Sequence, residues 1–119
     1  MKNPIQIKRI YDELAETDGY RILVDRLWPR GVKKEDAYLD EWDKDVAPST
    51  EIRKEFNHQD DRFAQFTKEY KKELAGKKEA LQHILDINQK YPVTLLYAAR
   101  SRTINHAIVL QEVLQKQKK

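Results

Sequence analysis

The apolar run at residues 93–99 constrains the fold of this chain more than any other sequence feature. Its residues are Val-Thr-Leu-Leu-Tyr-Ala-Ala, seven positions with almost no polar surface. A strand that is apolar at consecutive positions is covered on both faces, as happens for a central strand of a parallel sheet. The run therefore predicts an α/β fold that is organised around this strand.

Two further strands are predicted near the N-terminus. Residues 5–10 alternate apolar and polar side chains, and residues 20–27 contain the uninterrupted apolar run Ile-Leu-Val. Residues 11–19 lie between them and end in Asp-Gly, a turn signal. This segment has room for one helical turn in a parallel crossover or for a hairpin loop, so the pairing of the first two strands stays open.

Amphipathic spacing predicts that most of the remaining chain is helical. Ser49 and Asp60 are expected to cap the starts of two helices, and Gly76 is expected to end the second of them. The predicted helices are residues 34–46, 49–56, a segment after Asp60 with the stripe Phe63, Phe66, Tyr70 and Leu74, a segment that ends before Pro92, and residues 103–116.

With 119 residues, the chain fits one domain. We expect a single α/β domain over residues 1–119, with a lysine-rich tail from about residue 115. Because the predicted helices lie between and after the strands, the expected architecture is a small, mostly parallel sheet with helices on its faces. This is a three-layer, Rossmann-like arrangement.

The net charge of +3 gives little support to a role in nucleic-acid binding. Lys116, Lys118 and Lys119 lie in the last four residues, so the rest of the chain is close to neutral. A dedicated nucleic-acid-binding domain carries a strong basic patch. Nucleic acid is therefore the weaker alternative to a small ligand.

Other classes of site have no support in the sequence. Cysteine is absent, which excludes disulfides, thiolate metal sites and a cysteine nucleophile, and suits a reducing compartment. His58 and His83 have no partner at metal-ligand spacing, and the glycine-rich dinucleotide and nucleotide loops are missing, so neither a metal nor a cofactor is expected. No stretch approaches the roughly 20 apolar residues of a membrane span, so we expect a cytoplasmic location without membrane association.

Polar residues follow two of the predicted strands at the point where each strand ends. The second strand ends in Asp25–Gly31, and the last strand ends in Arg100–Thr103 directly before a predicted helix. In open α/β sheets, ligands bind beyond the carboxyl ends of the strands. The sequence therefore predicts one arginine-rich pocket at which these two segments meet.

The last strand-to-helix junction is a candidate anion site. Free N–H groups at a helix N-terminus attract negative charge. Ser101 and Thr103 add hydroxyl groups, Arg100 adds a bidentate donor, and Asn105 lies close enough to face the same space. The alternative is that Ser101 or Thr103 only caps the helix while Arg100 pairs with a carboxylate.

The segment after the second strand offers a rigid turn with charge around it. The Trp28-Pro29 pair restricts the backbone, and Arg26 and Arg30 flank an indole face that suits a flat ligand. In the alternative interpretation, Trp28 fills the core and the arginines pair with acids. The candidate acids are Asp40, Glu41 and Asp43, and Arg30 could also belong to a solvated basic run with Lys33 and Lys34.

Two residues of the pocket are candidates for acid–base catalysis. Asp25 ends a buried strand and His106 follows the last junction. The alternatives are an ion pair from Asp25 to Arg26 or Arg100 and a hydrogen-bonded, structural His106. Tyr97 is expected to pack in the core, with a ligand-facing hydroxyl as its second interpretation.

Together these segments resemble the YeaO-like branch of the domain of unknown function 488 family, in order and over essentially the whole chain. The resemblance implies a small bacterial or archaeal cytoplasmic α/β protein and no established activity. Longer relatives carry cysteines around residues 97–106, which this chain lacks, and relatives often have an acid or asparagine where Ser101 stands. The matching segments are Asp18 to Arg21, Val24 to Gly31, Leu39 to Trp42, Ala47 to Ser49, Leu95 to Arg100 and Asn105 to Ala107.

Three functional hypotheses follow. The first is an enzyme or sensor for a small anionic ligand such as a phosphorylated or nucleotide-like compound. The second is a nucleic-acid-binding module, and the third is a regulatory interaction protein without catalysis. A homodimer is compatible with each of them.

Overall fold

The sheet has four parallel strands in the order β1-β4-β2-β3. The computed structural model describes residues 3–57 and 59–118. β4 (Val93–Tyr97) is buried at every position and lies between β1 (Ile5–Arg9) and β2 (Tyr20–Leu23), while β3 (Glu41–Trp42) pairs with the other edge of β2. The prediction of a central apolar strand is confirmed. Because β1 and β2 are parallel and separated by β4, the crossover is correct and the hairpin is wrong.

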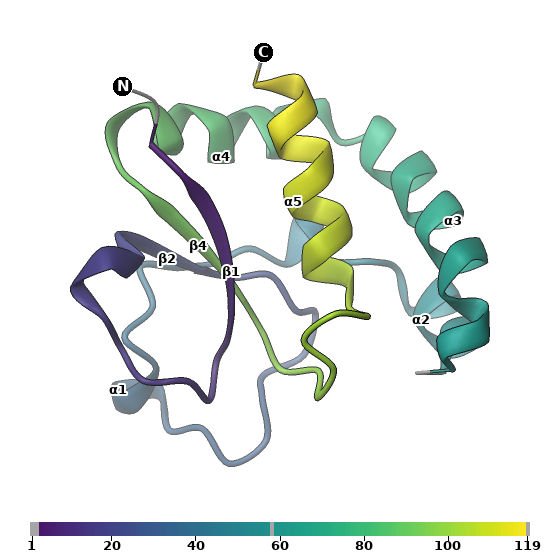
Figure 1. Ribbon diagram of the computed structural model, residues 1–119, viewed down its shortest axis with the longest axis horizontal. Helices are drawn as coiled ribbons and strands as arrows, with labels where there is room; N and C mark the ends of the chain where they lie inside the picture. Colours follow the sequence, from purple (N-terminus) through teal and green to yellow (C-terminus); the bar gives the residue numbers. More distant parts are fainter. Residues whose placement is uncertain (1–2, 58, 119) are drawn as a thin grey trace.

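The helices divide unequally between the two faces of the sheet (Figure 1). Among the residues that the structure describes, α2 to α5 cover one face, and α1 with its flanking loops covers the other, so the α/β fold class is confirmed with two unequal outer layers. The α-helices are α1 (Lys34–Ala37), α2 (Thr50–Phe56), α3 (Phe63–Ala75), α4 (Lys78–Lys90) and α5 (His106–Gln117). Short 3-10 turns are η1 (Glu16–Asp18), η2 (Lys44–Val46) and η3 (Asp60–Arg62).

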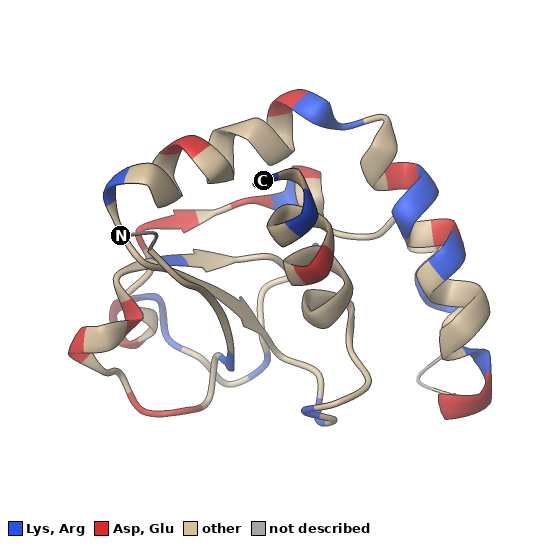
Figure 2. Cartoon of the chain, turned by 45° about the horizontal axis from the view of Figure 1, so that its top comes forward, with Lys and Arg blue, Asp and Glu red and all other residues tan. Residues whose placement is uncertain are grey.

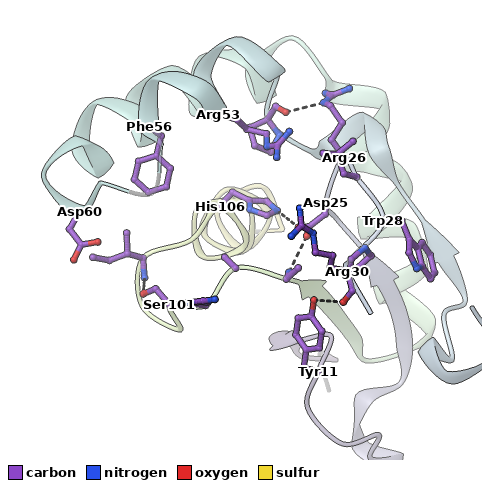
Figure 3. Close-up of a pocket in the computed structure, with 17 residues that line it drawn as sticks. Tyr11, Asp25, Arg26, Trp28, Arg30, Arg53, Phe56, Asp60, Ser101 and His106 are labelled. Atoms are coloured by element: carbon purple, nitrogen blue, oxygen red, sulfur yellow. Dashed lines mark hydrogen bonds and ion pairs between the residues drawn. The ribbon is translucent and has the colours of Figure 1, made fainter. Parts of the chain in front are cut away.

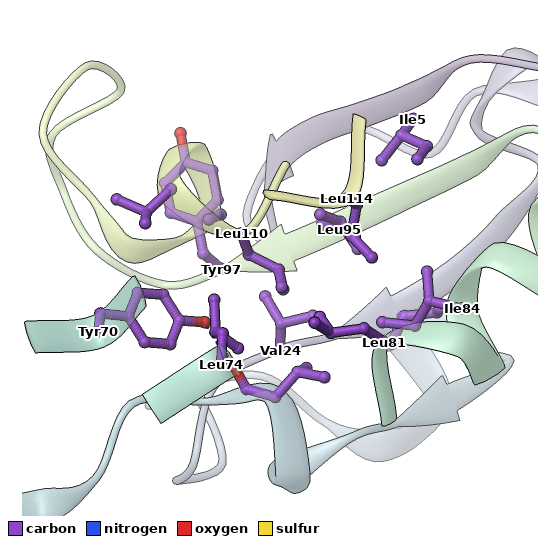
Figure 4. Packing of buried hydrophobic residues seen from close by; sticks show 14 of the residues in the cluster. Ile5, Val24, Tyr70, Leu74, Leu81, Ile84, Leu95, Tyr97, Leu110 and Leu114 are labelled. Carbon is purple, nitrogen blue, oxygen red and sulfur yellow. Dashed lines mark hydrogen bonds between the residues drawn. The ribbon is translucent and has the colours of Figure 1, made fainter. Parts of the chain in front are cut away.

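Two hydrophobic clusters correspond to the two faces. Ile22 and Leu95 point into the larger cluster, which α2 to α5 cover, whereas the neighbouring Leu23 and Leu96 point into the smaller one. This alternation is the period of a strand, whose successive side chains face opposite sides. Figure 4 shows the larger cluster, where Leu95 and Tyr97 of β4 pack with residues of α3, α4 and α5.

The helix predicted over residues 34–46 is wrong after its first turn. α1 ends at Ala37, Tyr38 adopts a left-handed conformation with φ 49°, and Trp42 belongs to β3. The buried guanidinium of Arg21 donates hydrogen bonds to the carbonyl groups of Ala37 (3.1 Å) and Tyr38 (3.0 Å), which ends the helix there. Strand pairing with β2 and burial of Trp42 therefore override the helical spacing.

The ends of several helices and strands differ from those predicted from the sequence. β2 stops at Leu23 rather than at residue 27, and α5 starts at His106 rather than at residue 103. Ser49 caps α2 as predicted, because its side chain accepts the N–H of Ile52. Asp60 does not cap α3, since it lies inside η3 and its side chain makes no capping bond. Gly76 ends α3 as predicted.

The C-terminal lysines do not form a separate tail in the described part of the chain. α5 continues to Gln117 and therefore includes Lys116. Lys119 and His58 lie outside the described residues. None of the helices that the structure describes has the length and apolar character required to cross a bilayer.

A buried ion-pair network holds the crossover from β1 to β2 in place. The carboxylate of Asp18 accepts hydrogen bonds from Lys8 (3.0 Å) and from buried Arg21, and its carbonyl accepts the hydroxyl of Thr94 (2.7 Å). Burial alone would raise the pKa of Asp18, but the hydrogen bonds from Lys8, from the Ala15 N–H and from Arg21 outweigh it and lower the pKa. The network connects the sheet to α1, because Arg21 also caps that helix.

Replacing Asp18 with asparagine is expected to destabilise the fold by about 3–5 kcal/mol at pH 7, because Arg21 then loses its buried counter-ion. A carboxyl whose folded pKa lies below its unfolded value stabilises the fold above the unfolded pKa, and this is lost as the pH falls through the folded pKa. The wild type should therefore lose stability as the pH falls through the ordinary value of 3.8 and below, and Asp18→Asn should lose less. Urea unfolding at pH 7 and pH 3 measures both effects.

The matched control is Glu112→Gln, which removes exposed ion pairs with Lys71 (3.0 Å) and Lys116 (3.3 Å). Exposed pairs contribute about 0–1 kcal/mol, so this variant should unfold nearly like the wild type. Equal unfolding free energies for the two variants at pH 7 would contradict a structural role for the Asp18 network.

Candidate functional site

A pocket of about 520 Å³ lies beyond the carboxyl ends of β2 and β4 (Figure 3). The chain leaves β2 toward α1 and β3, whereas it leaves β4 toward α5, which packs against β1 and β4 on the other face. Neighbouring strands whose connections leave in opposite directions create a crevice between their carboxyl ends, which is where ligands bind in open α/β sheets. The topology therefore accounts for the position of the pocket.

The predicted site residues divide into two groups. Those that line the pocket are Asp25, Arg26, Trp28, Arg30, Arg100, Ser101 and His106. Tyr97, Thr103 and Asn105 are not among its lining residues: Tyr97 and Asn105 are buried, and Thr103 is exposed. The ligand-binding and catalytic roles of these residues remain predictions.

Asp25 connects the segments that form the pocket. Its Oδ2 accepts the backbone N–H of Ala98 (3.0 Å), and its carbonyl accepts the indole N–H of Trp42 (2.7 Å). Its Oδ1 lies 2.9 Å from Nε2 of His106. The expected ion pair with Arg26 or Arg100 is therefore wrong. Asp25 instead joins the exits of β2 and β4 to β3 and to the start of α5.

The imidazole of His106 is oriented by the same junction. Its Nε2 lies 3.1 Å from the carbonyl oxygen of Val24, and because a carbonyl can only accept, we assign the hydrogen to Nε2. That N–H points toward Val24, so Oδ1 of Asp25 accepts no well-directed bond despite its short distance. The ring also contacts the buried Tyr70 edge-on, with centroids 6.3 Å apart. Nδ1 makes no hydrogen bond within residues 3–57 and 59–118, so it can interact with a ligand.

Arg26 has a structural role. Its guanidinium donates to the carbonyl groups of Pro48 (3.1 Å) and Ala47 (3.2 Å), which fixes the segment before α2 against the exit of β2. The proposed pairing of the pocket arginines with nearby acids is wrong. Those acids bind elsewhere: Asp40 accepts the Arg21 N–H, Glu41 binds Tyr20 and His83, and Asp43 caps η2.

Three other arginines of the pocket have no counter-ion. Within the described part of the chain, the guanidinium groups of Arg30, Arg53 and Arg100 form no ion pair or hydrogen bond. The alternative in which Arg100 pairs with a carboxylate is therefore wrong within the described part of the chain. By contrast, Arg102 in the same loop forms a bidentate pair with Asp12 (2.7 and 2.9 Å) and does not line the pocket.

Trp28 belongs partly to the core and partly to the pocket wall. Its ring packs edge-on against Trp42 with centroids 5.3 Å apart, and its N–H donates to the carbonyl of Val32 (2.7 Å). Trp28 therefore packs against the smaller hydrophobic cluster, in agreement with the alternative interpretation in which it fills the core. The part of Trp28 that lines the pocket offers carbon surface and no free donor.

The loop between β4 and α5 corrects the predicted helix-start site. Asn105 caps α5 by accepting the N–H of Ile108 (3.0 Å). Ser101 accepts the N–H groups of Thr103 (3.3 Å) and Ile104 (2.9 Å) through Oγ, so these donors are already occupied. Any anion near Ser101 would therefore bind to the loop and its side chains rather than to the first turn of α5.

The sequence did not reveal the contribution of the segment around α2. Arg53 and Phe56 of α2 and Asp60 of η3 line the pocket opposite the strand exits (Figure 3). Arg53 and Phe56 are three residues apart and share one face of a helix, which the sequence does show. Which face of the sheet that helix covers was decided only by the fold. Arg9 was also missed: it binds the carbonyl groups of Ala98 (3.3 Å) and Ala99 (2.9 Å) and holds the exit of β4.

A family model and the similar known proteins both place this chain in one family. A family model described as the inactive DUF488-N3 subclade matches residues 4–119. The chain is 52% identical to the uncharacterized protein YeaO of Escherichia coli K12 over 111 residues, 93% of this chain and 96% of the relative. It is 38% identical to the uncharacterized protein Rv3073c of Mycobacterium tuberculosis H37Rv over 110 residues, 92% of each chain. No solved structure matches. The described residues contain no group of three or more His, Asp or Glu side chains that could hold a metal ion.

Replacing Asp25 with alanine is expected to destabilise the fold by about 1–3 kcal/mol, since the part-buried N–H of Ala98 loses its acceptor. Urea unfolding at pH 7 measures the loss, and hydrogen exchange at Ala98 should become faster. Asp12→Asn, which weakens the exposed pair with Arg102, is the control and should cost less than about 1 kcal/mol. An unchanged exchange rate at Ala98 would show that Asp25 does not hold the strand exits together.

Proposed function

The chain belongs to the YeaO-like DUF488 family, in its inactive DUF488-N3 subclade, and we propose that it binds a small phosphate-bearing ligand in this pocket without transforming it. The role is that of a sensor or carrier of a phosphorylated metabolite. The observation that carries the proposal is the group of three unpaired arginines, Arg30, Arg53 and Arg100, around one cavity.

Arg30 and Arg100 are exposed and Arg53 is partly buried, and the three line one cavity although the chain is rich in acids. The sequence has 20 acidic residues against 23 lysines and arginines, so counter-ions are abundant. Both signs of charge occur along α3 and α4 (Figure 2). Three guanidinium groups that face one cavity repel one another, and an anion bound between them would relieve this repulsion. Arginine suits a phosphate because its planar donors match the phosphate oxygens.

Other donors of the pocket support the same ligand. The Oγ of Ser101 accepts two backbone N–H groups, and its own hydrogen is available for a ligand oxygen. In the described chain, the N–H groups of residues 99–101 are not used in hydrogen bonds. Nδ1 of His106 would accept a hydrogen bond from a phosphate hydroxyl when neutral and donate one when protonated. The cavity volume of about 520 Å³ is within the range of small-molecule sites.

Binding without turnover is supported by the state of the candidate catalytic groups. Asp25 accepts the Ala98 N–H, and its Oδ1 lies 2.9 Å from Nε2 of His106, whose N–H points to the carbonyl of Val24. The chain has no cysteine, so a thiol nucleophile is excluded. The description of the matching subclade as inactive agrees with this interpretation. Acid–base catalysis by Asp25 and His106 is the alternative that the experiment below also tests.

Alanine replacements of Arg30, Arg53 and Arg100 are expected to weaken the binding of inorganic phosphate about 10-fold or more each, the equivalent of one charge-assisted hydrogen bond. Isothermal titration calorimetry at constant pH and salt measures the dissociation constant. The melting temperature without ligand should stay nearly the same or rise, because the guanidinium groups form no hydrogen bond or ion pair among the described residues. Arg102→Ala is the matched control, since Arg102 lies in the same loop outside the pocket and should leave phosphate binding unchanged.

Three results would argue against this function. Absence of phosphate binding to the wild type, or an equal loss in Arg102→Ala, would contradict a specific site. Tighter binding of duplex DNA with a steep salt dependence would favour the nucleic-acid alternative. Release of phosphate from phosphoesters, abolished in His106→Ala, would favour catalysis over binding.

A further inference from the structure

The pocket has two ends of different chemistry. In Figure 3, Phe56 and Asp60 lie at one end, Arg30 and Trp28 lie at the other, and His106 is between them. A volume of about 520 Å³ is far larger than a phosphate ion, and pockets of about 300–1,000 Å³ hold ligands of the size of drugs or cofactors. A phosphate at the arginines would therefore leave the Phe56 end for the rest of a larger molecule.

Aromatic side chains supply much of the carbon surface of this pocket. Tyr11, Trp28 and Phe56 all line it. The hydroxyl of Tyr11 donates to the carbonyl of Arg30 (2.9 Å) and the N–H of Trp28 donates to Val32, so both polar atoms are already used. Phe56 is stacked on Phe66 with centroids 4.7 Å apart, which fixes the orientation of its ring. Such surfaces favour a flat, weakly polar ring system in the ligand.

Asp60 gives the Phe56 end of the pocket a preference for ligands that carry hydrogen-bond donors. Asp25 and Asp60 are the two acidic residues of the pocket lining, and Asp25 is already engaged with Ala98 and His106. The carboxylate of Asp60 forms no hydrogen bond or ion pair within the described residues, although its backbone carbonyl accepts the N–H of Phe63. Asp60 is exposed, and because a carboxylate can only accept hydrogen bonds, it favours a ligand donor at this end of the pocket and disfavours a second anionic group.

We propose that the ligand is a purine nucleoside monophosphate, with its phosphate at Arg30, Arg53 and Arg100 and its base at Phe56 and Asp60. This proposal rests on the phosphate-binding function above and specifies the ligand. Guanine presents a ring N–H and an amino group side by side, which match the two oxygens of a carboxylate. Adenine presents one amino donor beside a ring nitrogen that accepts, which a carboxylate repels. The pocket therefore selects guanine over adenine.

Isothermal titration calorimetry with the full chain tests the proposal with three probes: inorganic phosphate, guanosine 5′-monophosphate and adenosine 5′-monophosphate. The wild type should bind the guanosine compound about 10-fold or more tightly than either other probe, the effect of at least one hydrogen bond to a charged group. Asp60→Asn should lose this preference and keep its affinity for inorganic phosphate. Asp61→Asn is the matched control, because Asp61 is the adjacent exposed acid and does not line the pocket.

The outcomes separate the two proposals. Equal affinity for phosphate and the guanosine compound, an unchanged preference in Asp60→Asn, or tighter binding of the adenosine compound would overturn the assignment of the base site while the phosphate site stands. Failure of all three probes to bind would overturn the phosphate-binding function itself. Loss of the preference in Asp61→Asn as well would assign the effect to general acidity of the η3 turn and overturn the contact with Asp60.

Discussion

The hydrogen bonds of Asp25 are the constraint on which the pocket depends. One carboxylate accepts the Ala98 N–H where β4 ends and lies against His106 where α5 begins, and the carbonyl of the same residue accepts the Trp42 indole from β3. Buried polar groups need partners, and here each partner comes from a different part of the chain. The exits of β2 and β4 are therefore held at a fixed separation, which creates a stable cavity between them.

Six arginines of this protein fall into two classes, and the difference defines the site. Arg9, Arg21 and Arg26 donate to backbone carbonyl groups and hold together chain segments that are distant in sequence. Arg30 and Arg100, together with Arg53, face a cavity without a counter-ion in the described residues. A guanidinium that is satisfied by carbonyls contributes to the fold, whereas one that is left unsatisfied is available for an anion. Residue type alone does not separate these classes.

The main strands and most helices could be predicted because their signals are local. The apolar run of β4, the hydroxyl cap of α2 and the stripe of α3 each depend on a few neighbouring residues. The errors occur where a distant partner decides. Trp42 has helical spacing to Leu39 and Val46, but pairing with β2 makes it part of a strand. Residues 103–105 could have begun α5, but Ser101 accepts the N–H of Ile104, and Asn105 caps the helix by accepting the N–H of Ile108, so α5 starts at His106.

The sequence by itself determined that this chain forms an α/β fold around one buried strand, and that polar residues follow two strands at the same edge of the sheet. It could do so because apolar periodicity and strand direction are properties of short segments. Only the tertiary structure decided which side chains of that edge are free. Whether Arg26 or Arg53 faces an anion depends on the carbonyls and carboxylates that the fold brings near it, and α2, with Arg53 and Phe56, reaches the pocket only through the packing of the helical face.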